Sequence, residues 1–176
     1  VSENVGLDRI QFSMGSNFGD LDNDGWLDFY VGTGDAYFQA LMPNRMFRNN
    51  AGVRFQDVTS SGGFGLIEKG HGIGFGDIDH DGDQDVFAAM GGAYEGDLAH
   101  NVLFENPGHG NHWLSLWLEG VRSNRSAIGA RVTVTLEVDG SERSIHRVVS
   151  SGSTFGGNPL RLHIGLGRAQ RVSAVT

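Results

Sequence analysis

A nine-residue acidic stretch occurs twice in this chain, and its residue types and spacing suggest metal chemistry. The segments 20–28 (DLDNDGWLD) and 77–85 (DIDHDGDQD) share the pattern D-x-D-x-D-G-x-x-D at an offset of 57 residues. Carboxylates this close repel one another by roughly 3 kcal/mol per pair at ~5 Å and an effective dielectric of ~20. A cation between them would relieve the repulsion, and flexible all-oxygen ligation favours Ca²⁺.

The spacing predicts how each ion would be held. Acids at loop positions 1, 3 and 5 point inward on a tight turn, and glycine at position 6 permits a backbone angle that a Cβ would resist. The position-7 carbonyl and the position-9 carboxylate complete the shell. The predicted ligands of the two sites are, in the first loop, Asp20, Asp22, Asp24, the Trp26 carbonyl and Asp28, and in the second, Asp77, Asp79, Asp81, the Asp83 carbonyl and Asp85.

Two other interpretations of the acidic loops are open. An EF-hand shares this opening, but it requires a glutamate at position 12 and flanking helices. Position 12 is Val31 in the first loop and Ala88 in the second, and the residues around them have strand character. The other interpretation is a solvated acidic turn without an ion, which is disfavoured because the motif recurs in register.

Other chemistries find less support. The chain has seven histidines, but His109 and His112 lie beside a Pro/Gly break, with neither a Cys nor an H-E-x-x-H motif. The sequence contains no G-x-S-x-G, so serine hydrolysis is not indicated. The segment 123–125 (SNR) could bind an anion or hold a loop by hydrogen bonds, and the second role is favoured. Trp113 and Trp117 could form a sugar-stacking platform, although such a stripe is more often one side of a core.

The composition bounds the class of protein. The chain has 176 residues, 39% of them hydrophobic, and 28 glycines, about twice the usual share of roughly 7%. Many tight turns and short strands are therefore expected. The net charge is −8, but nine of the 21 acids lie in the two loops, so two Ca²⁺ ions would halve it. This acidity disfavours a nucleic-acid partner. Cysteine is absent, and no stretch approaches a membrane span of ~20 apolar residues. We expect a fragment of a longer chain.

An internal repeat surrounds the loops. Residues 16–49 align with 73–106 without a gap, and 14 of the 34 positions are identical. Each unit predicts an antiparallel sheet: a strand before the loop, a second at 28–32 or 85–89, and a third at 45–48 or 102–105. Residues 53–59 supply a fourth strand in the first unit only. In 70–76, glycines on alternate positions leave one strand face bare, which predicts a close backbone neighbour rather than a flexible loop.

The composition changes after the break at 106–110. The segment 112–119 alternates leucines with Trp113, Ser115 and Trp117, and 128–138 places Ile128 and every second residue after it on one apolar face. Asp139-Gly140 predicts a hairpin turn, followed by strands at 142–149 and 160–166. The end of the chain, 172–176, has the character of a further strand. These elements predict a compact antiparallel sheet or sandwich.

These motifs resemble two known families. The pattern F-G-D-x-D-x-D-G-x-x-D, followed by 44–50 (NRMFRNN) and 55–59 (FQDVT), resembles the FG-GAP/VCBS repeat of integrin-type β-propellers. The resemblance implies a four-stranded blade for each repeat, with a structural Ca²⁺ in the loop between its first two strands. Residues 111–176 resemble the ASPIC/UnbV domain, through NHWLSLWLEG, SNRSAIGARV and SGSTFGGN. The cartilage acidic protein family combines the two, and the resemblance implies no established catalytic residues.

The expected fold is therefore all-β: two four-stranded propeller-type blades, followed by a small antiparallel sheet or sandwich. The expected domains are 1–110, with repeats at about 10–65 and 66–110, and 111–176, truncated at its C-terminus. We expect a non-enzymatic, calcium-binding extracellular module for adhesion or recognition, with two Ca²⁺ ions and an extracellular protein or glycan as partner. We expect it to be secreted, periplasmic or at the cell surface, without membrane insertion. The alternative is a non-catalytic or substrate-binding part of a larger secreted enzyme acting on carbohydrate.

Overall fold

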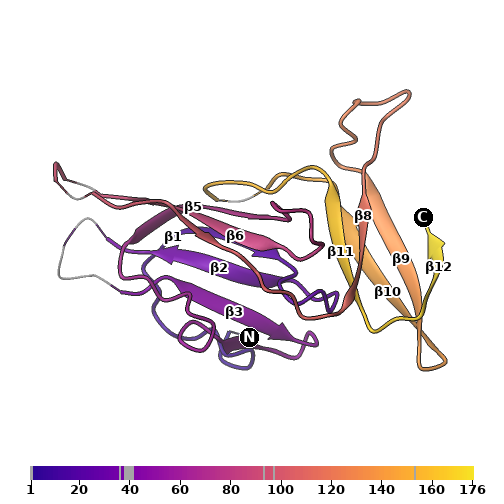
Figure 1. Cartoon of the computed structure of the whole chain (residues 1–176), viewed down its shortest axis with the longest axis horizontal. Coiled ribbons are helices and arrows are strands. Elements are labelled where there is room, and N and C mark those ends of the chain that lie inside the picture. The colour runs from indigo at the N-terminus through magenta and orange to yellow at the C-terminus, as the bar shows by residue number, and fades with distance from the viewer. Residues whose placement is uncertain (1, 36, 38–41, 93, 97, 153) are drawn as a thin grey trace.

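The computed structural model describes residues 1–176 except 1, 36, 38–41, 93, 97 and 153, and the described residues form strands without a helix. The fold is all-β, as the sequence predicted. Three groups of antiparallel strands follow one another along the chain (Figure 1). We call them blade one, blade two and the C-terminal domain.

Blade one is a four-stranded sheet in the order β1-β2-β3-β4. Its strands are β1 (Ser13–Gly19), β2 (Asp28–Thr33), β3 (Arg45–Asn50) and β4 (Arg54–Asp57). The first acidic loop joins β1 to β2, whose ends pair Gly19 with Asp28. The loop is therefore closed at its base by the sheet itself.

Blade two repeats this arrangement with one strand fewer. Its strands are β5 (Lys69–Gly76), β6 (Asp85–Gly91) and β7 (Val102–Phe104), in the order β5-β6-β7. Among the described residues, four strands are therefore found in blade one only, as the fourth-strand pattern in the first unit predicted, and the expectation of four strands in both blades is wrong for blade two. Pro107 follows β7 closely, and the chain then turns away into the C-terminal domain instead of pairing back along β7.

The repeat is preserved in its hydrogen bonds. The Asn44 side chain accepts a bond from the Thr33 N–H, and Asn101 accepts the equivalent bond from Met90. The Asn49 and Asn106 amide groups both donate to the carbonyl of the residue before the position-9 aspartate. The identical asparagines of the sequence alignment therefore hold equivalent strand connections in the two blades.

The two blades pack face to face around one apolar core. Side chains of blade one, such as Tyr30 and Met46, contact side chains of blade two, such as Ile73 and Phe75, and all four are almost completely buried. The bare strand face predicted at 70–76 is real and lies in β5. A Cβ on Gly74 would lie 3.1 Å from the Gly157 carbonyl oxygen, so the close neighbour is a segment of the C-terminal domain.

The C-terminal domain consists of two small sheets around a second core. One sheet has the order β10-β9-β12 and the other pairs β11 with β8. The strands are β8 (His112–Leu116), β9 (Arg131–Val138), β10 (Ser141–Val148), β11 (Leu162–Gly167) and β12 (Arg171–Val175). Leu114, Leu116 and Leu118 pack on this core, while Trp113 and Trp117 are exposed, in agreement with the predicted alternation.

One predicted strand begins later than expected. Ile128 is 55% exposed and lies before β9, which starts at Arg131. The Asn124 side chain bonds both the N–H and the C=O of Ile128, and Ala127 and Gly129 have positive φ. These bonds compete with strand pairing and form a turn. Asn124 therefore has the loop-holding role that the sequence favoured.

Candidate metal centre

The two acidic loops have the same backbone conformation. The position-4 residues Asn23 and His80 have φ of 55° and 66°, and the position-6 glycines Gly25 and Gly82 have φ of 88° and 94°. These left-handed angles bend the chain so that alternate side chains converge. The requirement for glycine that the motif predicted is therefore met in both loops.

The position-9 aspartates close the loops in the same way. Asp28 accepts hydrogen bonds from the N–H groups of Leu21 and Asn49, and Asp85 accepts those of Ile78 and Asn106. Each carboxylate thus ties the start of its loop to the chain at or just after the third strand of its blade. Both are buried.

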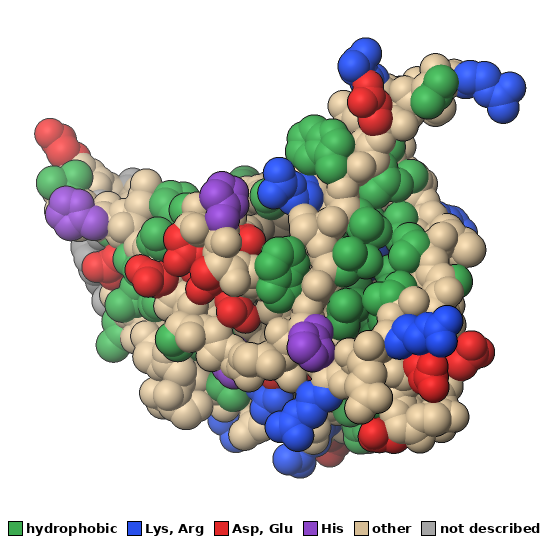
Figure 2. Space-filling model, turned by 45° about the vertical axis from the view of Figure 1, so that its right-hand side comes forward, with side chains coloured by type: hydrophobic (Ala, Val, Ile, Leu, Met, Phe, Trp, Pro, Cys, Tyr) green, Lys and Arg blue, Asp and Glu red, His purple; other side chains and the backbone are tan. Residues whose placement is uncertain are grey.

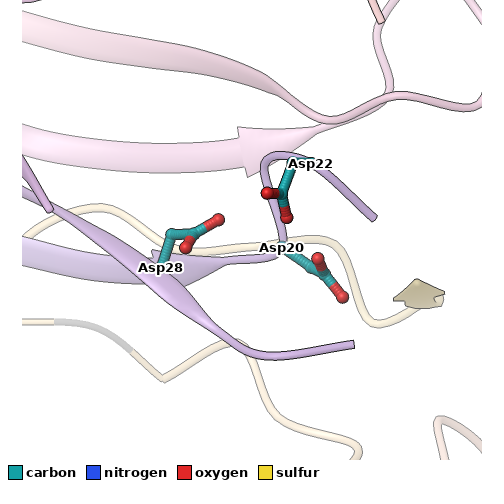
Figure 3. A group of neighbouring side chains, drawn as sticks. All are labelled: Asp20, Asp22 and Asp28. Carbon is teal, nitrogen blue, oxygen red and sulfur yellow. The ribbon is translucent and has the colours of Figure 1, made fainter. Parts of the chain in front are cut away.

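Each loop brings three carboxylates together. In the first loop, oxygens of Asp20, Asp22 and Asp28 lie within 4.8 Å of one another, and all three residues are buried. Figure 3 shows these side chains gathered where β1 ends and β2 begins. In the second loop, the group consists of Asp77, Asp79 and Asp81, of which the last two are exposed. Figure 2 shows acidic side chains collected on the surface of the molecule.

The remaining predicted ligands lie outside these groups. Asp24 accepts a hydrogen bond from the Trp26 N–H at 2.8 Å, and its equivalent Asp81, which does belong to the second group, accepts the same bond from the Asp83 N–H at 2.9 Å. Asp85 is engaged by the two N–H groups already described. The Trp26 and Asp83 carbonyls remain predicted ligands, because no contact among the described residues joins either carbonyl to a three-acid group.

The acids contain oxygen atoms that fit a cation. Oδ1 of Asp20, Asp22 and Asp77 is buried and has no hydrogen-bond partner among the described residues. A buried carboxylate oxygen without a donor costs free energy unless a proton or a cation compensates it. Hard oxygen donors at loop positions 1 and 3 are the ligands that Ca²⁺ prefers. The residues present therefore fit a calcium ion in each loop.

Burial changes the titration of the first loop. It raises the pKa of Asp20 from the ordinary 3.8 to about 7, although the Arg147 charge opposes this. Burial also raises the pKa of Asp28 to about 8, against the lowering effect of its two backbone hydrogen bonds. The pKa of Asp24 is raised too, mainly by burial. Without a cation, these groups favour the protonated form inside the folded protein.

The first loop is also where the three parts of the molecule meet. Asp20 accepts hydrogen bonds from the N–H groups of Gly25 and Gly165, and its backbone N–H donates to the Gln84 side chain. Gly165 belongs to the C-terminal domain and Gln84 to blade two. A single buried residue thus contacts three parts of the fold, through its carboxylate and its backbone N–H.

Arginines complete this junction. Arg143 donates to the Asp24 carbonyl at 2.8 Å and lies over the Trp26 ring, and Arg147 donates to the Gly25 carbonyl at 3.1 Å. Arg147 also lies 3.6 Å from the Asp20 carboxylate, and Arg48 forms an ion pair with Asp22. The acidic motif predicted none of these contacts. The sequence offered one signal for Arg48: the equivalent residue in blade two is Glu105, so the first unit has a cation where the second has an anion.

The two loops touch each other through Asn23. Its amide donates to the Gly82 carbonyl and to the Asp83 carboxylate, both at 2.9 Å. On its other side, the Asn23 side chain meets Nε2 of His163 at 2.8 Å, and the His163 ring stacks on Trp113. Burial lowers the pKa of His163, which favours a neutral ring. The two acidic loops and the C-terminal domain therefore form one connected polar network.

The family comparisons agree with this geometry. Residues 20–88 match the FG-GAP-like repeat family, and residues 120–176 match the family described as ASPIC and UnbV. Comparison with curated proteins gives no match. The chain contains an FG-GAP-like repeat region and an ASPIC/UnbV domain, as the sequence motifs predicted. This combination suggests an extracellular recognition module, because FG-GAP repeats are typical of extracellular proteins. Among the described residues, no helix is long and apolar enough to cross a membrane.

Proposed function

We propose that this chain is a calcium-binding, non-enzymatic extracellular module for adhesion or molecular recognition. Two Ca²⁺ ions are structural in this proposal, one in each acidic loop. The partner is an extracellular protein or glycan. The fold presents a binding surface to this partner and does not change it chemically. The chain acts in a secreted, periplasmic or cell-surface location.

The observation that carries the proposal is the set of buried carboxylate oxygens without donors. Asp20 and Asp22 each contribute such an oxygen to a group that also contains Asp28. Arg48 and Arg147 approach this group, but their N–H groups leave both Oδ1 atoms without a hydrogen bond. A Ca²⁺ ion, which takes 6–8 oxygens, supplies the missing positive charge.

Calcium would also explain how the blades and the C-terminal domain are held together. Asp20 contacts the C-terminal domain through Gly165, and its orientation depends on the loop conformation. An ion that fixes the carboxylates of the first loop therefore also fixes the surface on which the C-terminal domain packs. Metal binding is then coupled to folding of the whole chain.

Thermal unfolding tests this proposal. Extracellular modules bind Ca²⁺ with dissociation constants near 10⁻⁴–10⁻³ M. An ion at 100 times its dissociation constant stabilises by about 2.7 kcal/mol, and 1 kcal/mol shifts the Tm of a chain of this size by about 2–4 °C. We expect 10 mM Ca²⁺ to raise the Tm by at least about 5 °C relative to chelator. The proposal fails if the melting curves in Ca²⁺ and in chelator coincide. The same concentration of Mg²⁺ is the control for ionic strength.

A second candidate function rests on a cavity between the blades and the C-terminal domain. Its volume is about 420 Å³, and Trp117, Arg161, His163 and Asp77 are among its lining residues. Trp117 is 72% exposed, and the Arg161 guanidinium lies 5.8 Å from its ring centre. An exposed indole beside charged groups suits stacking against a sugar ring. This favours the carbohydrate-binding part of a larger secreted enzyme.

Glycan binding separates the two candidates. A Trp117→Ala variant would lose binding on a glycan array if the cavity holds a sugar, while its melting temperature in Ca²⁺ would stay unchanged. A wild-type protein that binds no glycan, and whose full-length form hydrolyses none, leaves only the first candidate.

A further inference from the structure

The cavity between the blades and the C-terminal domain has the size of a ligand pocket. Its volume of about 420 Å³ lies within the roughly 300–1,000 Å³ that such pockets occupy. Phe18 of blade one, Asp77 of the second acidic loop, and Trp117 and Arg161 of the C-terminal domain are among its lining residues. We call this space the junction cavity. Because Asp77 lines it, the charge of the second acidic loop acts on any ligand that it holds.

The C-terminal domain supplies the junction cavity with positive charge. Residues 111–176 contain eight arginines and four acidic residues, although the whole chain has a net charge of −8. Arg147 and Arg161 of this domain line the cavity, and the only carboxylate among its described lining residues is that of Asp77. An excess of one sign of charge in a cleft attracts ligands of the opposite sign. The cavity therefore favours an anionic ligand over a neutral one.

The two arginines differ in what they leave free for a ligand. Arg147 is mostly buried, donates to the Gly25 carbonyl and lies 3.6 Å from the Asp20 carboxylate. Arg161 is exposed, and it has no ion-pair partner among the described residues. Arg147 thus contributes a fixed charge to the wall of the cavity, whereas Arg161 has N–H groups available to an anion.

Trp117 indicates the shape of the ligand. Its side chain is 72% exposed, and the Arg161 guanidinium lies 5.8 Å from the centre of its ring. An exposed indole offers a flat apolar face on which a sugar ring can stack. A guanidinium pairs well with a carboxylate or another oxyanion, because it donates two parallel hydrogen bonds. The indole and the guanidinium side by side therefore fit a sugar that carries an anionic group.

The charge of the junction cavity depends on the two acidic loops. Asp20 belongs to the three-acid group of the first loop, and Asp77 belongs to that of the second. A Ca²⁺ ion in each loop compensates both carboxylates, so the charges of the two arginines then dominate the cavity. Without the ions, Asp77 repels an anionic ligand and Asp20 offsets Arg147. An anion should therefore bind best to the calcium-loaded chain, and by linkage it should raise the affinity for calcium.

We propose that the junction cavity binds an acidic saccharide in a calcium-dependent manner. Trp117 stacks on the sugar ring, and Arg161 pairs with the carboxylate or sulfate that the sugar carries. This inference rests on the glycan-binding role and on the two calcium sites proposed above. It adds the charge of the ligand and the dependence of its binding on the second acidic loop.

A glycan array in 10 mM Ca²⁺ tests the class of ligand. The array pairs sialylated, uronate-containing and sulfated glycans with their uncharged counterparts. We expect the 176-residue chain to bind acidic members of these pairs and not the neutral ones, and to bind them more weakly as salt is added. The pairs that respond distinguish carboxylate from sulfate, and either supports the proposal. Equal binding of the neutral counterparts overturns it but leaves the glycan-binding role, whereas binding of no glycan removes both.

Charge-matched variants locate the site by calorimetric titration with an acidic glycan that the array identifies. Arg161→Gln should weaken binding at least about tenfold, because a charge-assisted hydrogen bond is lost. Arg171→Gln makes the same change of charge in β12, outside the described lining residues, and should leave the affinity as in wild type. Both variants should keep the Tm of the wild type in Ca²⁺. An unchanged affinity in Arg161→Gln, or equal losses in the two variants, overturns the proposal.

A third variant tests the dependence on calcium while the first loop keeps its ion. Asp79→Asn removes a predicted ligand of the second ion and leaves Asp77 in the wall of the cavity. We expect this variant to bind the acidic glycan several-fold more weakly than wild type in 10 mM Ca²⁺, since the Asp77 charge is no longer compensated. Calorimetry with Ca²⁺ alone checks that one ion is lost. A variant that has lost the ion and keeps the wild-type glycan affinity contradicts the calcium dependence.

Discussion

The two acidic loops share a motif, a backbone and a set of hydrogen bonds, yet they lie in opposite environments. Asp20, Asp22 and Asp28 of the first loop are buried, whereas Asp79 and Asp81 of the second are exposed. The first loop is covered by the C-terminal domain through Gly165 and Gly167. The second meets that domain at Gly82, where the Trp113 ring occupies the space that a Cβ would take.

The charged side chains around the two loops differ as well, because arginines lie beside the acids of the first loop. Arg48 pairs with Asp22, and Arg147 lies near Asp20. In blade two the residue equivalent to Arg48 is Glu105, and the described ion pairs of the loop acids all belong to the first loop. The comparison teaches that the motif sets the shape of the loop, while the surroundings decide how strongly the rest of the fold depends on it.

The largest expected effect on stability comes from replacing the position-1 aspartate, and its size should differ between the two loops. Asp20→Ala leaves the Gly25 and Gly165 N–H groups without an acceptor and Arg147 without its anion. Removing one partner of a buried charge pair costs about 3–5 kcal/mol. Asp77→Ala should cost less, up to the roughly 2.7 kcal/mol of one saturated ion. Urea unfolding in 10 mM Ca²⁺ measures both, and equal losses would contradict the comparison.

The next effect is a pH dependence that belongs to the first loop. The pKa values of Asp20 and Asp28 are raised to about 7 and about 8, so the metal-free fold favours their protonated forms. This stability is present below the unfolded-state pKa of 3.8 and is lost as pH rises through 7 and 8.

In chelator, we therefore expect the free energy of unfolding to fall by about 2–3 kcal/mol for each of the two groups between pH 5 and pH 7, since one pKa unit is worth about 1.4 kcal/mol. Saturating Ca²⁺ should flatten this profile, because the ion stabilises the ionised carboxylates. Asp28→Asn should weaken the dependence in chelator. A profile that rises with pH in chelator would show that these carboxyl groups ionise readily without a cation.

The smallest expected effect concerns the ion pair of Arg48 with Asp22. The Arg48 side chain is 49% exposed, so the pair contributes no more than about 1 kcal/mol. Arg48→Gln should lower stability slightly in chelator and strengthen calcium binding at the first loop, because a competing cation is removed. Calorimetry on this variant, with Arg45→Gln as the matched control in the same strand, checks the change. An unaltered affinity would mean that Arg48 does not compete with the ion.

Much of the local structure was predictable from the sequence. The repeat at an offset of 57 residues predicted the strands that flank each loop, and Gly25 and Gly82 predicted the left-handed turns. The alternation of Leu114 and Leu116 predicted which face of β8 enters the core. These features depend on local periodicity and turn chemistry, which a sequence records directly.

The environment of the loops was not predictable in the same way. That Asp20 meets Gly165 and Arg147 depends on packing between segments more than 120 residues apart. The two loops share all four motif aspartates and the glycine, so the motif itself does not distinguish the buried loop from the exposed one. The described residues of blade two include no fourth strand, which agrees with Pro107, because a proline close after β7 cannot donate to a sheet ladder.

Calorimetric titration of the metal-free chain with Ca²⁺ tests the central claim most directly. The account predicts two ions per chain for the wild type, and one each for Asp22→Asn and Asp79→Asn. It also predicts that the ion lost in Asp22→Asn carries the larger share of the calcium-dependent rise in Tm, because the first loop joins the blades to the C-terminal domain. A wild-type chain that binds no Ca²⁺ at millimolar concentrations, with its carboxylates intact and its fold unchanged, would contradict it.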